Sequence, residues 1–365
     1  MYYYKYMLKS VPTSKATTQP SPGYRSMLVF LCALALVVLA GCAGGGASVP
    51  SARATACIGA IALSVGGCQQ NQIPPTPKSA HTAFCVYVDY TNSVGISAAP
   101  QIKAAKFDCI RTYYYSPRAS YAWVSPAIAS GLSFIFVIPS PTVADMSDPT
   151  AYIADVQSAM HRWPGQSWEL TAEPDQGMNV PAYVRPSVVL TPAQYVGFFR
   201  SVIPSMRAAD PSARIISGGA VGKGGMDPNW VAEISGLWPL VDNIGIHAYP
   251  PPWLQNPIPT LPAIFAAILT QTGKPAIMTE WGLAQRYAPL KPGDPWPNPL
   301  TQAQAASDMT QMVSTVDGIT PIFGVYEWTN NDDPWAATEG FGIVGTPELA
   351  AFTSARGLLA AAPIH

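Results

Sequence analysis

The chain has 365 residues, of which 48% are apolar and 11% are charged, so it can bury a large core and is too apolar for a disordered protein. Its 20 Lys and Arg residues nearly balance 21 Asp and Glu residues, which excludes the strongly basic surface of a nucleic-acid-binding protein. A neutral partner fits this composition better than a polyanion.

The N-terminal segment has the order of a secretory signal. Basic residues without acids precede an apolar run from Met27 to Ala40, which ends in the small residues of Leu39–Cys42. The run is shorter than the roughly 20 residues of a membrane-spanning helix. The cysteine after Leu-Ala-Gly resembles a bacterial lipobox, whose thiol is acylated before cleavage. We therefore expect residues 1–42 to be a signal peptide, lipidation at Cys42, and a location at the cell envelope or outside the cell.

Other ways of processing the N-terminus stay open. The apolar run also fits an unlipidated signal peptide or an uncleaved membrane anchor. A second, weaker apolar run ends at Cys68, where cleavage is an alternative. Residues 43–80 mix Gly, Ala, Ser and Pro without a hydrophobic period, which predicts a flexible tether. We expect the folded domain to comprise residues 81–365.

Export would permit disulfides, because they persist in oxidising compartments. Cys85 and Cys109 lie near the starts of the first two expected strands. They are therefore placed either to bridge neighbouring parallel strands or to remain as two buried free thiols.

Short apolar or β-branched runs recur along residues 84–328 at the intervals of βα units. The expected strands are Phe84–Tyr90, Cys109–Tyr115, Leu132–Pro139, Trp168–Ala172, Arg214–Gly218, Asn243–Ala248, Ala276–Thr279 and Pro321–Trp328. Helix-like stretches between and after them are Asp148–Trp163, Tyr195–Ala209, Thr260–Thr272, Thr301–Val316 and Thr346–Ala361. This alternation predicts an α/β protein with a single (β/α)8 TIM barrel, with a doubly wound sheet as the alternative.

Two of the expected strands run directly into glutamates. Trp168–Ala172 is followed by Glu173, and Ala276–Thr279 is followed by Glu280. Catalytic residues of TIM barrels gather at the carboxyl ends of the strands. Glycoside hydrolysis requires two carboxyl groups flanking the scissile bond, and these two glutamates would supply them.

The segments Trp168–Asp175 and Ile277–Gly282 resemble strands four and seven of the retaining glycoside hydrolases in the large (β/α)8 clan of β-glycosidases and endoglycanases. The likeness covers about residues 84–361. It implies hydrolysis of a β-linked oligo- or polysaccharide by double displacement, with Glu173 as general acid/base and Glu280 as nucleophile.

Further residues fit the same resemblance. It implies that Arg111 keeps the nucleophile ionised, that His247 lines the sugar site, and that the Tyr249 hydroxyl bonds the nucleophile. Trp281 and Trp328 are expected to bind substrate, because sugar C–H faces pack on indole rings. A hydrogen-bonded structural histidine and a core tryptophan are the alternatives for His247 and Trp328.

One residue departs from the clan. Ala172 occupies the position before the acid/base where the clan has an asparagine that bonds the sugar 2-hydroxyl. This departure supports an alternative function, a catalytically impaired barrel that binds carbohydrate as a surface lipoprotein. Glu169 lies well before the strand end, and we expect it to point away from the site.

Other function classes lack their motifs. Gly218–Gly224 faintly suggests a phosphate loop, but its spacing is one residue short and glycine replaces the magnesium-binding Ser or Thr. The four histidines are not spaced as a zinc motif, and there is no Gly-x-Ser-x-Gly elbow. We therefore expect no cofactor or metal, no nucleic-acid partner, membrane contact only through the lipid anchor, and a monomer that binds carbohydrate.

Overall fold

The computed structural model describes the greater part of the expected domain. The described residues are 81–88, 94–114, 121–175, 189–219, 228–248, 258–283, 301–325, 327–329 and 342–361. The signal peptide 1–42, the tether 43–80, Cys42 and Cys68 lie outside them, so processing and the cell-envelope location stay predictions. Among the helices that are described, none combines the length and the apolar character that a membrane crossing requires.

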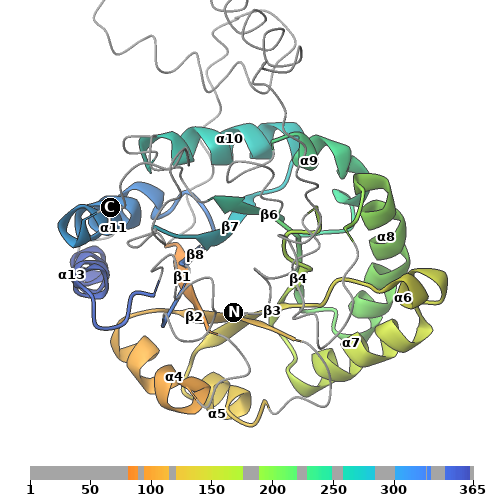
Figure 1. Cartoon of the computed structure of the whole chain (residues 1–365), viewed down its shortest axis with the longest axis horizontal. Helices are drawn as coiled ribbons and strands as arrows, with labels where there is room; N and C mark the ends of the chain where they lie inside the picture. The colour runs from red at the N-terminus through yellow and green to blue at the C-terminus, as the bar shows by residue number, and fades with distance from the viewer. Residues whose placement is uncertain are drawn as a thin grey trace, which may run out of the picture. The chain divides into compact units, whose positions relative to one another are not determined.

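Parallel strands form a nearly closed barrel (Figure 1). They are β1 Ala83–Tyr87, β2 Cys109–Tyr113, β3 Ser133–Val137, β4 Ser167–Leu170, β5 Arg214–Ser217, β6 Ile244–Ala248, β7 Ala276–Trp281 and β8 Ile322–Val325. β1 pairs with both β2 and β8, and an isolated bridge between Ile216 and Asn243 joins β5 to β6. This cyclic order confirms the predicted (β/α)8 barrel, and the doubly wound sheet is wrong.

Helices surround the strands in a ring (Figure 1). They are α4 Val94–Ala104, α5 Val124–Ala129, α6 Val143–Ser147, α7 Thr150–Arg162, α8 Pro192–Ala209, α9 Pro228–Glu233, α10 Leu261–Thr272, α11 Gln302–Val316 and α13 Pro347–Ala361, with short 3-10 turns at Ser235–Leu237 and Ile258–Thr260. Capping boxes begin α8 and α11, where Thr191 and Thr301 accept hydrogen bonds from the third residue of each helix. The sequence pattern missed α4, α5, α6 and α9, three of which are too short to show a helical period.

Alternation along the strands separates two apolar layers. On β3, for example, Phe134 and Phe136 face the helices, whereas Ile135 faces the barrel interior. The interior layer contains Cys85, Cys109, Ile135, Ile216, Ile277 and Ile322. Cys85 and Cys109 occupy paired register positions on β1 and β2, and a disulfide joins them within this layer. Inward-facing polar residues nearer the carboxyl ends of the strands therefore rest on this tightly packed apolar layer.

Glu348 is a buried carboxyl group in the helical layer. It lies in the first turn of α13, which packs against α11, and it is 1% exposed. Burial, with a smaller contribution from Asp308 on α11, raises the pKa of Glu348 to about 8. Because the folded-state pKa is raised, Glu348 binds its proton more tightly in the folded state than in the unfolded state. Stability is therefore fully present below about pH 4.5 and falls as the pH rises toward 8.

We expect Glu348→Gln to remove most of this pH dependence. The amide keeps a neutral hydrogen-bonding group, so the variant should gain on the order of 4 kcal/mol over the parent at pH 8 and little at pH 4. Calorimetric Tm values at the two pH values measure the difference. Glu233→Gln, at an exposed position of α9, is the control and should follow the parent. An unchanged difference in Tm between pH 4 and pH 8 would show that Glu348 is ionised in the folded protein.

Candidate active site

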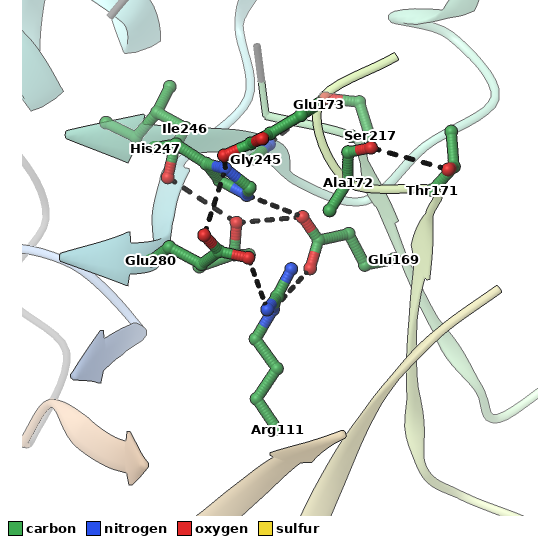
Figure 2. A network of polar contacts seen from close by, with 12 residues as sticks. Arg111, Glu169, Thr171, Ala172, Glu173, Ser217, Gly245, Ile246, His247 and Glu280 are labelled. Atoms are coloured by element: carbon green, nitrogen blue, oxygen red, sulfur yellow. Dashed lines mark hydrogen bonds and ion pairs between the residues drawn. The ribbon is translucent and has the colours of Figure 1, made fainter. Parts of the chain in front are cut away.

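The two predicted catalytic glutamates meet at the carboxyl ends of the strands. Glu280 lies within β7, and Glu173 follows β4. Arg111 of β2 and His247 of β6 lie between and beneath them (Figure 2). The structure thus brings together four of the residues that the sequence singled out, from four different strands.

Arg111 holds Glu280 from below. Its Nη1 atom lies 2.5 Å from Oε1 of Glu280, and both side chains are buried. Burial alone would lower the pKa of Arg111, but Glu169 and Glu280 outweigh that effect and raise it well above its ordinary value. The guanidinium also lies 5.5 Å from the ring centroid of Tyr113. Arg111 is therefore a permanent cation in direct contact with Glu280.

A β-bulge in β7 aims Glu280 into the barrel. Ile246 of β6 pairs with Met278, but the next residue, His247, pairs with Glu280, so Thr279 is an extra residue in β7. Strict alternation from the outward-facing Met278 would turn Glu280 outward and Trp281 inward. With the bulge, Thr279 and Glu280 both contact interior residues, and Trp281 faces the helices.

His247 is surrounded by carboxyl groups. Its Nδ1 atom lies 3.2 Å from Oε1 of Glu173 and 3.4 Å from Oε2 of Glu280, and its Nε2 atom lies 3.2 Å from Oε1 of Glu169. Burial alone would lower the pKa of His247, but Glu280, Glu169 and Glu173 raise it to about 10. The ring is therefore an imidazolium at neutral pH. Its Nδ1–H is directed at Glu173 and Glu280, and its Nε2–H is directed at Glu169.

The backbone around Glu173 adopts an uncommon conformation. Thr171 has a φ of 57° and Glu173 a φ of 43°, a left-handed region that costs about 1–3 kcal/mol for each non-glycine residue. The Glu173 N–H donates to the carbonyl of Gly219 (2.9 Å), and a hydrogen bond joins the hydroxyls of Ser140 and Thr171 (2.8 Å). These contacts hold the turn that carries the carboxyl group back over the barrel.

Glu173 differs from Glu280 in its electrostatic setting. Its side chain is 15% exposed, and it contacts His247 but has no ion pair with Arg111 among the contacts of the described residues. Burial and the charge of Glu280 raise the pKa of Glu173, and together they outweigh the contact with His247, which lowers it. The environment therefore favours the protonated form of Glu173, as a general acid requires.

The glycines that faintly suggested a phosphate loop have a packing role here. A Cβ atom on Gly219 would lie 2.4 Å from Cδ2 of His247, so only glycine lets β5 end beside β6. One on Gly218 would lie 2.1 Å from the carbonyl oxygen of Thr171. Residues 220–227 of the same segment lie outside the described residues.

The prediction for Glu169 is wrong. Trp168 and Leu170 face the helices, so Glu169 points into the barrel, where it is fully buried. It accepts hydrogen bonds from Arg111 Nε (2.8 Å) and Thr279 Oγ1 (2.9 Å). Burial alone would raise the pKa of Glu169, but Arg111 and His247 lower it to about 2. The apolar residues on either side of Glu169 were the sequence signal for this orientation.

The two tryptophans proposed as substrate-binding residues do not face the site. Trp281 is 1% exposed and packs edge-on against Phe323 in the layer between sheet and helices. Trp328 is also buried in that layer, against Phe107. Both indoles therefore stabilise the core, and a sugar-binding role for them is withdrawn. Tyr249 lies outside the described residues.

Tyr113 is a site residue that sequence analysis passed over. It lies on β2 two residues beyond Arg111, so it faces the same way, and it is half-buried. Burial, followed by the charges of Glu280 and Glu173, raises the pKa of its hydroxyl well above the ordinary value. The ring packs edge-on against Tyr87 at 5.6 Å. The Arg-x-Tyr spacing at a strand end was the available signal.

The donor atoms of Glu173, His247 and Glu280 lie within 4.8 Å of one another, as in a small metal site. Two features favour protons over a metal ion there. Arg111 already contributes a positive charge beside Glu280, and a metal would have to displace the proton that the raised pKa of His247 holds on the ring. We therefore treat the cluster as a proton-sharing site.

Comparisons with known proteins indicate the fold. No protein-family model and no curated protein matches the chain. Its structure is similar to a glucosidase from Croceicoccus marinus (TM-score 0.56, 14% identity, 79% of this chain and 69% of that one). It is also similar to a variant of a subgroup I GH128 endo-β-1,3-glucanase from Amycolatopsis mediterranei (0.51, 15%, 75% and 100%) and a β-glucuronidase from an uncultured Clostridium (0.50, 15%, 78% and 53%). The chain thus shares its (β/α)8 barrel fold with these glycosidases.

Proposed function

We propose that this protein hydrolyses β-linked glycosides with retention of anomeric configuration. Glu173 is the general acid/base and Glu280 the nucleophile. The observation that carries the proposal is the pair itself, two strand-end carboxyl groups in opposite electrostatic settings. Arg111 contacts one of them, and burial favours a proton on the other.

The separation of the pair supports retention. An oxygen of Glu173 and an oxygen of Glu280 lie within 4.8 Å of each other. Retaining enzymes hold their carboxyl groups about 5–5.5 Å apart, whereas inverting enzymes need about 6.5–9.5 Å to admit a water molecule. At this short distance the anomeric carbon of the sugar can lie next to Glu280. A water molecule does not fit between a carboxylate and the scissile bond.

The proposed reaction has two displacements. Glu173 donates its proton to the glycosidic oxygen as the Glu280 carboxylate attacks the anomeric carbon, so the C–O bond to the leaving group breaks and a glycosyl ester forms. Glu173, now ionised, removes a proton from water, which attacks the same carbon and releases Glu280. The imidazolium of His247 lies against both carboxyl groups, where it offsets the negative charge that passes between them.

The comparisons support a glycosidase, though at 14–15% identity they do not indicate which sugar is bound. The activities of these three proteins set a first substrate panel of β-glucosides, β-glucuronides and β-1,3-glucan oligosaccharides. Xylan and mannan oligosaccharides extend it, because a barrel fold alone does not determine which sugar is bound.

A carbohydrate-binding barrel without turnover is the second candidate. Ala172 favours it, because its buried methyl group presents no hydrogen-bonding group where an amide would bind the sugar. Binding of a panel sugar by the full chain, without hydrolysis of any panel member, would support this candidate and contradict the enzyme.

Glu173→Ala tests the assigned roles. We expect the variant to lose about 10²–10⁴-fold in kcat/KM on oligosaccharides, whose leaving groups need protonation, and far less on 2,4-dinitrophenyl glycosides, which do not. The parent should lose activity as rising pH removes the Glu173 proton, and this basic limb should vanish in the variant. Steady-state rates across pH 4–9 measure both effects, with exposed Glu233→Ala as the control. An equal loss on all leaving groups would exclude Glu173 as the acid.

A further inference from the structure

Glu169 links the two cations of the site. One carboxylate oxygen contacts Nε of Arg111 at 2.8 Å, and the other contacts Nε2 of His247 at 3.2 Å and Oγ1 of Thr279 at 2.9 Å. Arg111 continues to Glu280, and His247 continues to Glu173 and Glu280 (Figure 2). Each path from Glu169 to the catalytic pair therefore passes through one cation.

Glu169 is too deep to reach a substrate. It is fully buried within β4, and the donors from β2, β6 and β7 occupy both of its oxygens. A buried carboxylate with three converging donors keeps its charge and has one orientation. Any effect of Glu169 on the reaction must therefore be transmitted through the residues that it contacts.

Glu169 determines what the two cations present to the site. By accepting from Nε2 of His247, it leaves Nδ1–H directed at Glu173 and Glu280. By accepting from Nε of Arg111, it leaves Nη1 for Glu280. Among the described residues, the charged groups around the imidazolium are Glu169 of β4, Glu173 of the turn after β4, and Glu280 of β7. Arg111 of β2 contacts two of these carboxylates, Glu169 and Glu280.

We propose that Glu169 is a positioning residue that holds Arg111 and His247 as ordered cations, so that Arg111 presents Nη1 to Glu280 and His247 presents Nδ1–H to Glu173 and Glu280. The kinetic part rests on the proposed function, whereas the charge state of His247 does not. Thr279, the extra residue of the β7 bulge, contributes to the same positioning. Its hydroxyl donates to Glu169 from the strand that carries Glu280.

The test measures the charge of His247 directly. Histidine labelled with ¹³C at Cε1 is followed by NMR from pH 5 to 9 in the full chain, and His247→Asn identifies the signal among the four histidines. We expect His247 to remain an imidazolium throughout in the parent. In Glu169→Gln its pKa should fall by about 2 units or more. A parent His247 that is neutral at pH 7 would overturn the proposal without any variant.

Steady-state kinetics are the second measurement that tests the proposal. We expect Glu169→Gln to lower kcat by about 100-fold and to move the basic limb of the pH profile to higher pH, because an uncharged His247 no longer lowers the pKa of Glu173. Glu169→Asp keeps the charge and should restore the imidazolium signal and part of the rate. Glu348→Gln removes a buried carboxyl group elsewhere in the fold and should change neither. A folded Glu169→Gln with an unchanged His247 signal or an unchanged pH profile would refute the positioning role.

The two proposals fail in different ways. If no panel glycoside is cleaved by the parent, the proposed function fails, and the NMR titration still decides whether Glu169 controls His247. If the parent cleaves glycosides but His247 has the same pKa in the parent and in Glu169→Gln, the proposed function is supported and the positioning role is refuted.

Discussion

Glu280→Ala should lower kcat by about 10⁴-fold or more on every glycoside that the parent cleaves, whatever its leaving group. The reason is that alanine offers no oxygen to attack the anomeric carbon, so the first displacement is lost. The loss should exceed that of Glu173→Ala on activated substrates, which need a nucleophile but no acid. Initial rates on 2,4-dinitrophenyl and oligosaccharide substrates measure this difference.

Added azide distinguishes a lost nucleophile from a damaged site. In Glu280→Ala, azide occupies the space of the missing carboxylate and attacks from that side, so a β-glycoside should give the α-glycosyl azide. Glu173→Ala should give the β-glycosyl azide, because Glu280 still forms the ester. Circular dichroism establishes that both variants are folded. A Glu280→Ala variant that retains parent activity, or one that yields the β-azide, would exclude Glu280 as nucleophile.

Arg111→Met should have the second-largest effect. The substitution keeps an apolar stem but removes the guanidinium that contacts Glu169 and Glu280. Two buried carboxylates thereby lose their contact with this cation. Breaking a buried ion pair from one side costs about 3–5 kcal/mol, and we expect a loss of that size in the free energy of unfolding by urea. Activity should fall as well, because Glu280 loses the guanidinium that contacts its carboxylate.

Arg111→Lys separates charge from geometry. Lysine keeps the positive charge but cannot present Nε to Glu169 and Nη1 to Glu280 at once, so it should recover part of the stability and little of the activity. Arg162→Met, at an exposed position in α7, is the control for loss of an arginine. Full parent activity in Arg111→Met would show that the nucleophile needs no cation.

The barrel could be predicted from the sequence because its strands are short apolar runs between turn signals. The second expected strand, Cys109–Tyr115, was observed as Cys109–Tyr113, and the fifth, Arg214–Gly218, as Arg214–Ser217. Short helices escaped prediction, since a segment such as Val124–Ala129 contains fewer than two helical turns. Pattern reading detects long elements better than short ones for this reason.

The proximity of Glu173 and Glu280 could also be predicted, because both glutamates directly follow apolar strands. The orientation of Trp281 could not, because it depends on the extra residue that the bulge inserts at Thr279. Nothing in the sequence marks a bulge there, and its effect is to exchange the faces of Glu280 and Trp281. The inward orientation of Glu280 and the outward orientation of Trp281 therefore have one physical origin.

Glu169 was missed for a different reason. Its distance from the strand end was weighed more heavily than the alternation of Trp168 and Leu170 on either side, although alternation decides which face a side chain occupies. The contacts of Glu169 with Arg111 and His247 join strands 58 and 78 residues away along the chain. Sequence patterns carry no direct information on contacts at such separations.

The measurement that tests the central claim most directly is mass spectrometry of the full chain after incubation with 2,4-dinitrophenyl 2-deoxy-2-fluoro-β-glycosides of the panel sugars. The fluorine slows hydrolysis of the glycosyl ester more than its formation by an activated leaving group, so the intermediate accumulates. The account predicts one glycosyl group per chain, located by peptide mapping on Glu280 and absent from Glu280→Gln. A sugar attached to another side chain, or turnover with inverted product and no adduct, would contradict it.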